Sequence, residues 1–235
     1  MAIPQACSRA CRACRSTKRR GSSSSLHANP ASVSLCFPSI KESVMRKTLL
    51  VAALFAFAGS AFAAPVTYKL DPTHTDVIAQ WNHFGFSNPT AHFGQAEGSL
   101  VYDAANVAKS SVQVTLPLSG LNAFSAKFDE HLRSAEIFDA TKFPSASFKS
   151  TKVEDLGGGK LKVTGNLTIK DITKPVVLDV TLNKVGENMQ KQPAIGFDAS
   201  TTLKRSDFGV GLYAPAVSDE VKIRITTEAG VPKAK

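Results

Sequence analysis

The chain has 235 residues, a formal net charge of +9 and four cysteines, but these totals combine two segments of different character. Nine of the 28 Lys and Arg residues and one of the 19 Asp and Glu residues lie in residues 1–63, so residues 64–235 carry a net charge of only +1. This part lacks the excess positive charge on which nucleic-acid binding depends, and we expect no nucleic-acid partner. All four cysteines precede residue 45, so the remainder has to be stable without disulfides.

Residues 45–63 have the pattern of a secretory signal peptide. Arg46 and Lys47 supply the positive start, and the uncharged run from Leu49 to Ala58 is too short to span a bilayer. The sequence Ala61-Phe62-Ala63 is a small-x-small cleavage site. We therefore expect cleavage after this site and export to the periplasm.

Residues 1–44 stand in front of that positive start, where a signal peptide has no place for them. We interpret them as a mis-assigned upstream extension, with translation beginning at Met45. The segment is rich in Ser, Arg and Cys without apolar periodicity, which is typical of disorder. The spacing of Cys7, Cys11 and Cys14 imitates a set of metal ligands, but a zinc site needs four ligands held by a fold, and we expect no metal.

Residues 64–235 read as a single all-β domain, because apolar and polar residues alternate along successive segments. In the segment 75–84, for example, Val77, Ala79 and Trp81 share one face. After a short lead-in at 68–71, the pattern predicts strands at 75–84, 91–102, 110–118, 146–153, 161–169, 175–182, 195–203 and 221–226.

The alternation is interrupted once, between Phe128 and Ser150. There Leu132, Ile137 and Phe138 fall at roughly helical spacing, and Pro144 ends the run because the residue before a proline is pushed out of helical space. We predict a short helical segment between two halves of the sheet. Its charged and apolar faces indicate that it lies across one end of the sheet structure.

About eight strands that are apolar on one side only favour a closed antiparallel barrel, which leaves no exposed edges. An outer-membrane barrel is the alternative, since it also follows a signal peptide. That class requires aromatic girdles at the strand ends, whereas this chain has three Tyr and one Trp and carries a charged helical segment. We therefore predict an apolar interior and no stable membrane insertion.

Four motifs in order resemble those of the YceI family of exported, lipocalin-like, polyisoprenoid-binding proteins. The resemblance extends from about Tyr68 to Glu228, nearly all of the chain after residue 63. Two positions depart from the family pattern, Asp171 where a glycine is usual and Ile137 where an aromatic is usual. The motifs are Asp71-Pro72-Thr73-His74-Thr75, the stretch 128–150, Val163 to Lys170 with Thr173-Lys174-Pro175-Val176, and Arg205-Ser206-Asp207-Phe208-Gly209.

The resemblance implies an eight-stranded antiparallel lipocalin-like barrel that holds a long isoprenoid-type chain, such as a quinone or a polyprenyl phosphate. It also implies a homodimer, since dimers occur in the family. It implies no cofactor beyond the bound lipid. Taken with the alternation, it predicts a ligand-binding apolar lining formed by Trp81, Phe84, Phe93, Val114, Leu116, Phe128, Leu132, Phe138, Leu178, Val180 and Phe197.

Four polar residues are candidates for binding the head group of such a lipid: His74, His131, Arg133 and Arg205. The pair His131 and Arg133 adjoins two acidic residues, so a solvated helix face with local ion pairs is an equal alternative. For Arg205 we expect a salt bridge or turn contact with Asp207.

Three histidines, His74, His83 and His92, recur every nine residues. An odd spacing places successive residues on opposite faces of a strand, so we favour structural roles over a shared metal site.

The sequence offers no catalytic set. Residues 64–235 contain no G-x-S-x-G motif, no cysteine nucleophile and no phosphate-binding glycine loop, so we expect no enzymatic activity. A lipid-binding protein is the first hypothesis. An enzyme acting on such a lipid and a solid-cored, stress-related interaction module remain as alternatives.

Overall fold

The computed structural model of the protein describes residues 64–232. The predicted upstream extension, the signal peptide and the cysteines all lie outside the described residues.

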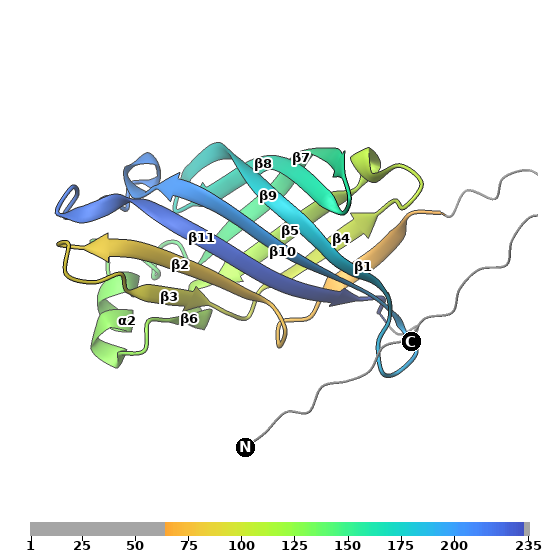
Figure 1. The fold of residues 1–235 in the computed structure, drawn as a ribbon. Coiled ribbons are helices and arrows are strands. Elements are labelled where there is room, and N and C mark those ends of the chain that lie inside the picture. Colours follow the sequence, from red (N-terminus) through yellow and green to blue (C-terminus); the bar gives the residue numbers. More distant parts are fainter. Residues whose placement is uncertain (1–63, 233–235) are drawn as a thin grey trace, which may run out of the picture. The chain divides into compact units, whose positions relative to one another are not determined.

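Antiparallel strands make up most of residues 64–232 (Figure 1). One α-helix and three short 3₁₀ turns connect them. The strands are β1 (Val66–Leu70), β2 (Asp76–His83), β3 (Thr90–Phe93), β4 (Glu97–Tyr102), β5 (Ser111–Pro117), β6 (Leu121–Asn122), β7 (Ser145–Gly157), β8 (Lys160–Ile169), β9 (Ile172–Glu187), β10 (Pro193–Lys204) and β11 (Val217–Gly230); the helix is α2 (Ala126–Arg133), and the turns are η1 (Val107–Lys109), η2 (Leu118–Gly120) and η3 (Arg205–Phe208).

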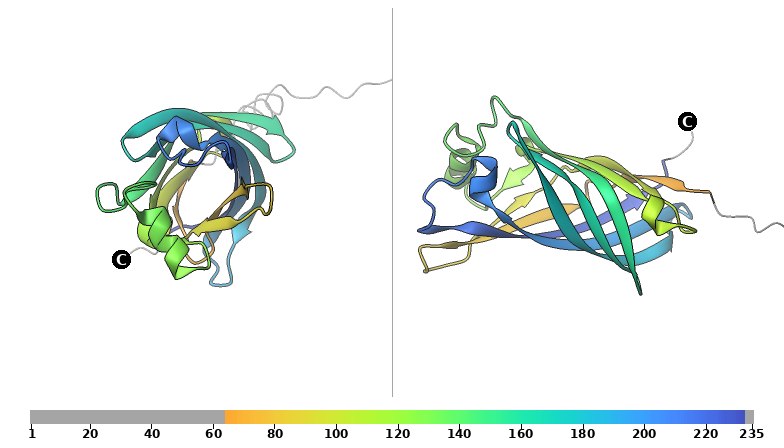
Figure 2. Two further views of the ribbon diagram at one scale, coloured as in Figure 1. Left: turned by 90° about the vertical axis from the view of Figure 1, so that its left-hand side faces the viewer. Right: turned by 90° about the horizontal axis from the view of Figure 1, so that it is seen from above.

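Eight strands close a barrel in the order β1-β4-β5-β7-β8-β9-β10-β11, and β11 pairs back to β1. The short strands β2, β3 and β6 extend β1, β4 and β5 toward one end, where they pair in the order β11-β2-β3-β6. The view along the barrel shows the strands around a common axis, with α2 at that end (Figure 2). The predicted eight-stranded antiparallel barrel with one short helix is confirmed.

The predicted strand 91–102 is interrupted between β3 and β4. Gln95 has a φ of 57°, and the Gly94 N–H donates to the Gly120 carbonyl at 3.0 Å. A Cβ atom on Gly120 would collide with the Gly94 carbonyl, so the close approach of these two segments requires a glycine. The bend lets β3 and β6 leave the direction of the main ring.

The barrel wall divides where β6 leaves β7. The β5–β7 ladder ends at the pair of Pro117 and Ser145, and the Leu118 N–H then donates to the Pro144 carbonyl at 2.8 Å. The chain between β6 and β7 lies at this division and includes α2. The predicted helical segment is therefore confirmed in type and place, but Ile137 and Phe138 lie in turns that follow the helix.

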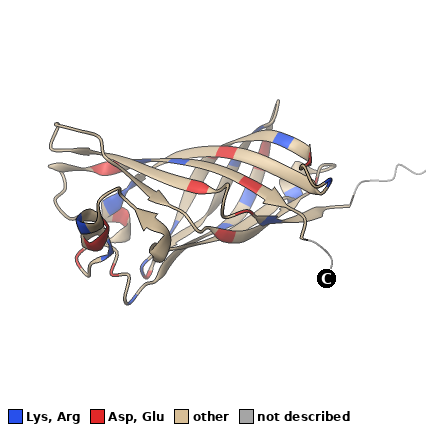
Figure 3. Cartoon of the chain, turned by 90° about the horizontal axis from the view of Figure 1, so that it is seen from below, with Lys and Arg blue, Asp and Glu red and all other residues tan. Residues whose placement is uncertain are grey.

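Charged residues of both signs are distributed along the barrel strands (Figure 3). Within residues 64–232, no helix has the length and hydropathy that a membrane crossing requires.

Candidate functional site

The barrel encloses a cavity of about 530 Å³ with an almost entirely apolar wall, to which every strand of the ring contributes. Pockets for small molecules typically measure about 300–1,000 Å³. All of the apolar residues that the sequence nominated lie on this wall, and their contact with a ligand stays a prediction: Trp81, Phe84, Phe93, Val114, Leu116, Phe128, Leu132, Phe138, Leu178, Val180 and Phe197.

The inner wall is covered only partly by other side chains. Leu178 and Val180 point inward from β9, yet both are half-buried. In the packed clusters of the same barrel, Leu121 and Ile195 are each 2% exposed. Because period-two alternation turns the β9 residues inward and they line a cavity, the barrel differs from a solid-cored module.

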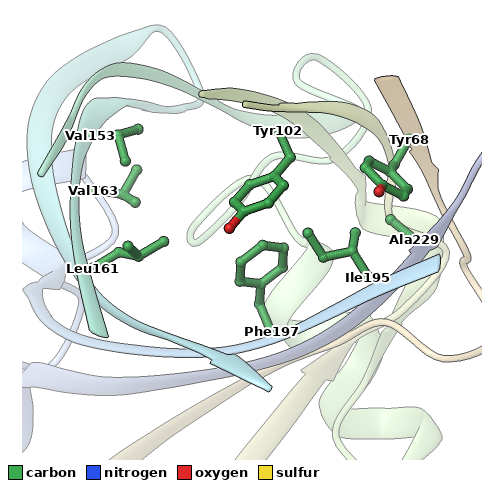
Figure 4. Close-up of a cluster of buried hydrophobic side chains, with 8 residues drawn as sticks. All are labelled: Tyr68, Tyr102, Val153, Leu161, Val163, Ile195, Phe197 and Ala229. Carbon is green, nitrogen blue, oxygen red and sulfur yellow. The ribbon is translucent and has the colours of Figure 1, made fainter. Parts of the chain in front are cut away.

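A cluster of buried side chains from β1, β4, β7, β8, β10 and β11 faces the barrel interior (Figure 4). The rings of Tyr102 and Phe197 meet edge to face there, with centroids 6.4 Å apart, and both lie on the cavity wall. Tyr68 and Ile195 belong to the same cluster but not to the wall. Burial raises the pKa of the Tyr102 phenol.

At one end of the barrel, α2 carries Phe128, His131 and Leu132 onto the cavity wall. The Phe128 ring lies 6.0 Å from Trp81 and stacks on His131 at 6.4 Å between centroids. These positions repeat at three- and four-residue spacing, which places them on one helical face. The helix therefore supplies an aromatic part of the wall at its end of the barrel.

Arg133 fastens α2 to the barrel rather than facing the cavity. Its Nε donates to the Leu118 carbonyl at 2.9 Å, and its Nη2 donates to the Leu121 carbonyl. These carbonyls lie where β6 diverges from β7. From the end of β8, Lys170 Nζ donates to the Ile137 carbonyl, in the turns after α2, at 2.9 Å. The geometry thus gives Arg133 a structural role and does not support its nomination for a head group.

Arg205 lies on the cavity wall, but its guanidinium is engaged by the backbone. It donates to the carbonyls of Ser218, Val210, Leu212 and Val217 at 2.8, 2.9, 3.1 and 2.9 Å. Burial lowers the pKa of this guanidinium. Arg205 therefore joins η3 to the start of β11, which does not support its nomination for a head group either.

Arg205 and Asp207 lie in the same turn, η3, but the predicted salt bridge between them is wrong. Asp207 instead pairs with Lys174 of β9 at 2.8 Å. The carboxylate that binds this turn is Asp219, which accepts hydrogen bonds from the Ser206 N–H and hydroxyl at 2.7 and 2.6 Å. Those hydrogen bonds lower the pKa of Asp219.

His74 lies in the turn between β1 and β2 and is not part of the cavity wall. Its Nδ1 is 2.7 Å from an Asp71 carboxylate oxygen, and Thr73 donates to the other oxygen at 2.6 Å. Hydrogen bonds from Thr73 and His74 lower the pKa of Asp71 to about 2, and the bond to Asp71 raises the pKa of His74. This turn contact gives His74 a structural role.

The other histidines separate into two groups. His92 pairs with Asp76 at 2.6 Å between Nδ1 and the carboxylate, whereas His83 and His131 lie on the cavity wall. Among residues 64–232, no group of three His, Cys, Asp or Glu side chains is placed to hold a metal ion. Of the four head-group candidates, His131 and Arg205 lie on the cavity wall. The side chain of Arg205 donates to backbone carbonyls, whereas the His131 ring stacks on Phe128.

Sequence reasoning missed several parts of the wall. Tyr102 lies nine residues after Phe93, so unbroken alternation turns it outward, and only the break between β3 and β4 brings it to the wall. Leu212 and Tyr213 lie in the loop before β11, where no periodicity marks them. His83 also lies on the wall, although the sequence marks it only by its nine-residue spacing from His74 and His92.

The sequence profile of the YceI-like domain matches residues 68–229, which is most of the chain. The chain belongs to the YceI family. A UPF0312 protein of Vibrio cholerae is 37% identical over 184 residues, covering 77% of this chain and 97% of the relative. The protein YceI of Salmonella arizonae is 34% identical over 187 residues, covering 78% and 97%.

Solved structures of similar proteins have the same fold. The crystal structure of BcnA from Burkholderia cenocepacia matches with a TM-score of 0.62 and 27% identity, covering 68% of this chain and 98% of that one. The Campylobacter jejuni YCEI protein gives a TM-score of 0.59 and 29% identity, covering 65% and 90%. A polyisoprenoid binding domain from Saccharophagus degradans gives a TM-score of 0.53 at 12% identity, covering 70% and 98%, which shows the shared fold alone.

Proposed function

We propose that this YceI-family protein binds a long isoprenoid-type lipid in its barrel and stores, sequesters or carries it. The observation that carries the proposal is the apolar cavity of about 530 Å³ with its half-buried wall. Burial of each methylene contributes roughly 0.8 kcal/mol, so an apolar wall alone can hold a long chain. The polyisoprenoid binding domain of Saccharophagus degradans, which shares the fold, supports the choice of ligand.

We propose that the head group of the lipid binds at the α2 end of the barrel, the mouth, where the exposed side chains of Phe84 and Tyr213 also line the cavity. His131 lies on the wall there, and His83 lies on the wall beside the loop that follows β2. An imidazole donates a hydrogen bond to a quinone carbonyl and, when protonated, forms a charge-assisted bond to a phosphate. Both a quinone and a polyprenyl phosphate suit this arrangement.

The proposal is binding without turnover. An enzyme acting on the same lipid would need a nucleophile or an acid–base pair at the reacting atom. The wall carries the hydroxyls of Thr75 and Thr227, which bond to each other at 2.8 Å, and Arg205, which is engaged by carbonyls. It also carries His83 and His131, but within residues 64–232 no hydrogen bond joins either ring to a hydroxyl or a carboxylate.

Native mass spectrometry before and after organic extraction tests the proposal. The protein purified from its own cells should carry an added mass that the solvent removes and that is identified as an isoprenoid. The extracted protein should regain the mass when a quinone or polyprenyl phosphate is supplied. A protein that contains no lipid and takes up neither compound would refute lipid binding.

We also propose that residues 45–63 direct export and that the protein acts in the periplasm. The hypothesis rests on the sequence pattern of that segment. N-terminal sequencing of the exported protein should begin at Ala64. A mature protein that retains residues before Met45 would contradict the assigned start.

A further inference from the structure

Two loops at the mouth of the barrel are exposed and uncharged. Residues 84–89 connect β2 to β3, and residues 211–216 precede β11 (Figure 2). Their sequences, Phe-Gly-Phe-Ser-Asn-Pro and Gly-Leu-Tyr-Ala-Pro-Ala, contain no Asp, Glu, Lys or Arg, although 20% of the whole chain is charged. We call these two segments the mouth loops.

The mouth loops lie side by side and present aromatic side chains to solvent. The Phe84 N–H donates to the Ala216 carbonyl at 3.0 Å and joins the two loops. Phe86 is 92% exposed, Tyr213 57% and Phe84 50%. Large apolar side chains exposed together in this way mark an interaction surface.

The backbone holds two of these aromatics in a strained conformation. Phe84 has a φ of 52° and Tyr213 a φ of 63°, a region that bulky residues rarely occupy. Such conformations cost free energy and concentrate at binding sites. The strain therefore agrees with a functional surface.

The exposed aromatic surface is continuous with the cavity, because Phe84 and Tyr213 also lie on its wall. A long-chain lipid that passes through free water loses the favourable burial of every methylene on the way. A mouth placed against a bilayer avoids that step. Aromatic side chains are the residues enriched at membrane–water interfaces, and uncharged loops enter that region without desolvating a charge.

We propose that the mouth loops dock on the surface of a lipid bilayer and that the lipid passes between bilayer and cavity at this contact. The side chains of Phe86 and Tyr213 enter the headgroup region. The inference rests on the proposed lipid binding and adds the bilayer as the direct partner of the mouth.

Flotation with vesicles of phosphatidylethanolamine and phosphatidylglycerol tests the docking. Phe86→Ser is the informative variant, because Phe86 is exposed and does not line the cavity. Met189→Ser is the matched control, because Met189 is 97% exposed in the β9–β10 turn at the opposite end. Phe86→Ser should lower vesicle binding roughly tenfold, and Met189→Ser should leave it unchanged. Circular dichroism verifies that both variants are folded.

A second measurement separates docking from lipid binding. Geranylgeraniol is delivered either from cyclodextrin or from the same vesicles and is detected through Trp81, the one tryptophan of the chain, which lies on the cavity wall. Phe86→Ser should slow uptake from vesicles roughly tenfold and leave the dissociation constant measured with cyclodextrin unchanged.

Each contrary result has a distinct meaning. Wild-type protein that binds no geranylgeraniol from cyclodextrin overturns the proposed function. Wild-type protein that binds it, but matches Phe86→Ser in flotation and in uptake from vesicles, overturns the docking alone. If sedimentation shows that Phe86→Ser dissociates a dimer while flotation is unchanged, the mouth loops join two copies of the chain and the docking is likewise overturned.

Discussion

Replacing Leu178 by tryptophan tests whether the barrel interior is empty, and Leu121→Trp is the matched control. Leu121 is 2% exposed and packed beside α2, off the cavity wall. Overpacking such a site costs about 1–3 kcal/mol, so Leu121→Trp should lower the free energy of unfolding by that amount. Leu178 faces a cavity of about 530 Å³, so the indole enters existing space. In delipidated protein, Leu178→Trp should cost less than about 1 kcal/mol.

The same substitution should weaken lipid binding. If the indole occupies the place of two to three methylenes, at roughly 0.8 kcal/mol each, the binding free energy falls by roughly 2 kcal/mol. That loss corresponds to roughly a 30-fold higher dissociation constant. Leu121→Trp leaves the wall unchanged and should bind lipid with the wild-type affinity wherever it remains folded.

Urea denaturation followed by circular dichroism, on protein extracted with organic solvent, measures the stabilities. Fluorescence is unsuitable because each variant adds a second tryptophan. A Leu178→Trp protein that is destabilised as much as Leu121→Trp, without lipid, would show that the interior is close-packed and would refute the cavity.

Three further predictions concern single contacts. The folded state lowers the pKa of Asp71 to about 2, so the ionised carboxylate stabilises the protein above its unfolded pKa near 4, and this stability is lost as the pH falls toward 2. In an acid titration, Asp71→Asn should therefore lose less free energy of unfolding than the wild type across that interval. The difference should be under about 1 kcal/mol because the carboxylate is exposed. Gly165→Val should lower the free energy of unfolding, measured by urea denaturation, by about 1–3 kcal/mol and should also weaken lipid binding. The reason is that a Cβ atom at this position collides with the Phe148 ring and pushes it into the cavity. Lipid binding equal to that of the wild type would contradict this. Arg205→Lys should lower the free energy of unfolding by about 3 kcal/mol, nearly as much as Arg205→Met, because an ammonium cannot replace a guanidinium that donates to four carbonyls. If Arg205→Lys retained wild-type stability, this structural role of the guanidinium would be contradicted.

The strands and the inward direction of most wall residues follow from the alternation of apolar and polar residues. Alternate residues of a strand share a face, so Val77, Ala79 and Trp81 are predicted to point the same way. All three lie on the cavity wall. The same rule correctly turned Leu178 and Val180 inward. A resemblance to the family then supplied the closed barrel, which the pattern only favoured.

The division of the wall could not be predicted in this way. The inward apolar positions change from Ala91 and Phe93 to Leu100 and Tyr102 across Gly94, but the collision that requires Gly120 involves a segment distant in sequence. In the central stretch, Ile137 and Phe138 have helical spacing, but the helix ends at Arg133 and the following turns bring both side chains to the cavity.

The head-group candidates were the least reliable part of the predicted site, because they were chosen by polar residue type. Sequence alone does not say whether an arginine is engaged by carbonyls, which come from any residue type. Arg133 and Arg205 both bind backbone carbonyls, and His74 binds the nearby Asp71. Only the three-dimensional arrangement separates these residues from His131, whose ring stacks on Phe128 at the cavity wall.

If the barrel binds a lipid as proposed, its half-buried inner wall ties the lifetime of this protein to the supply of that lipid. Val114 and Leu116 are among the inward side chains that gain full cover only when a chain occupies the barrel. A ligand that binds the folded state alone stabilises it by about 2.7 kcal/mol at a hundredfold excess over the dissociation constant. That shift lowers the unfolded fraction roughly a hundredfold. Where proteases remove unfolded chains, loaded barrels persist and empty ones are degraded, so the abundance of the protein tracks the abundance of the lipid.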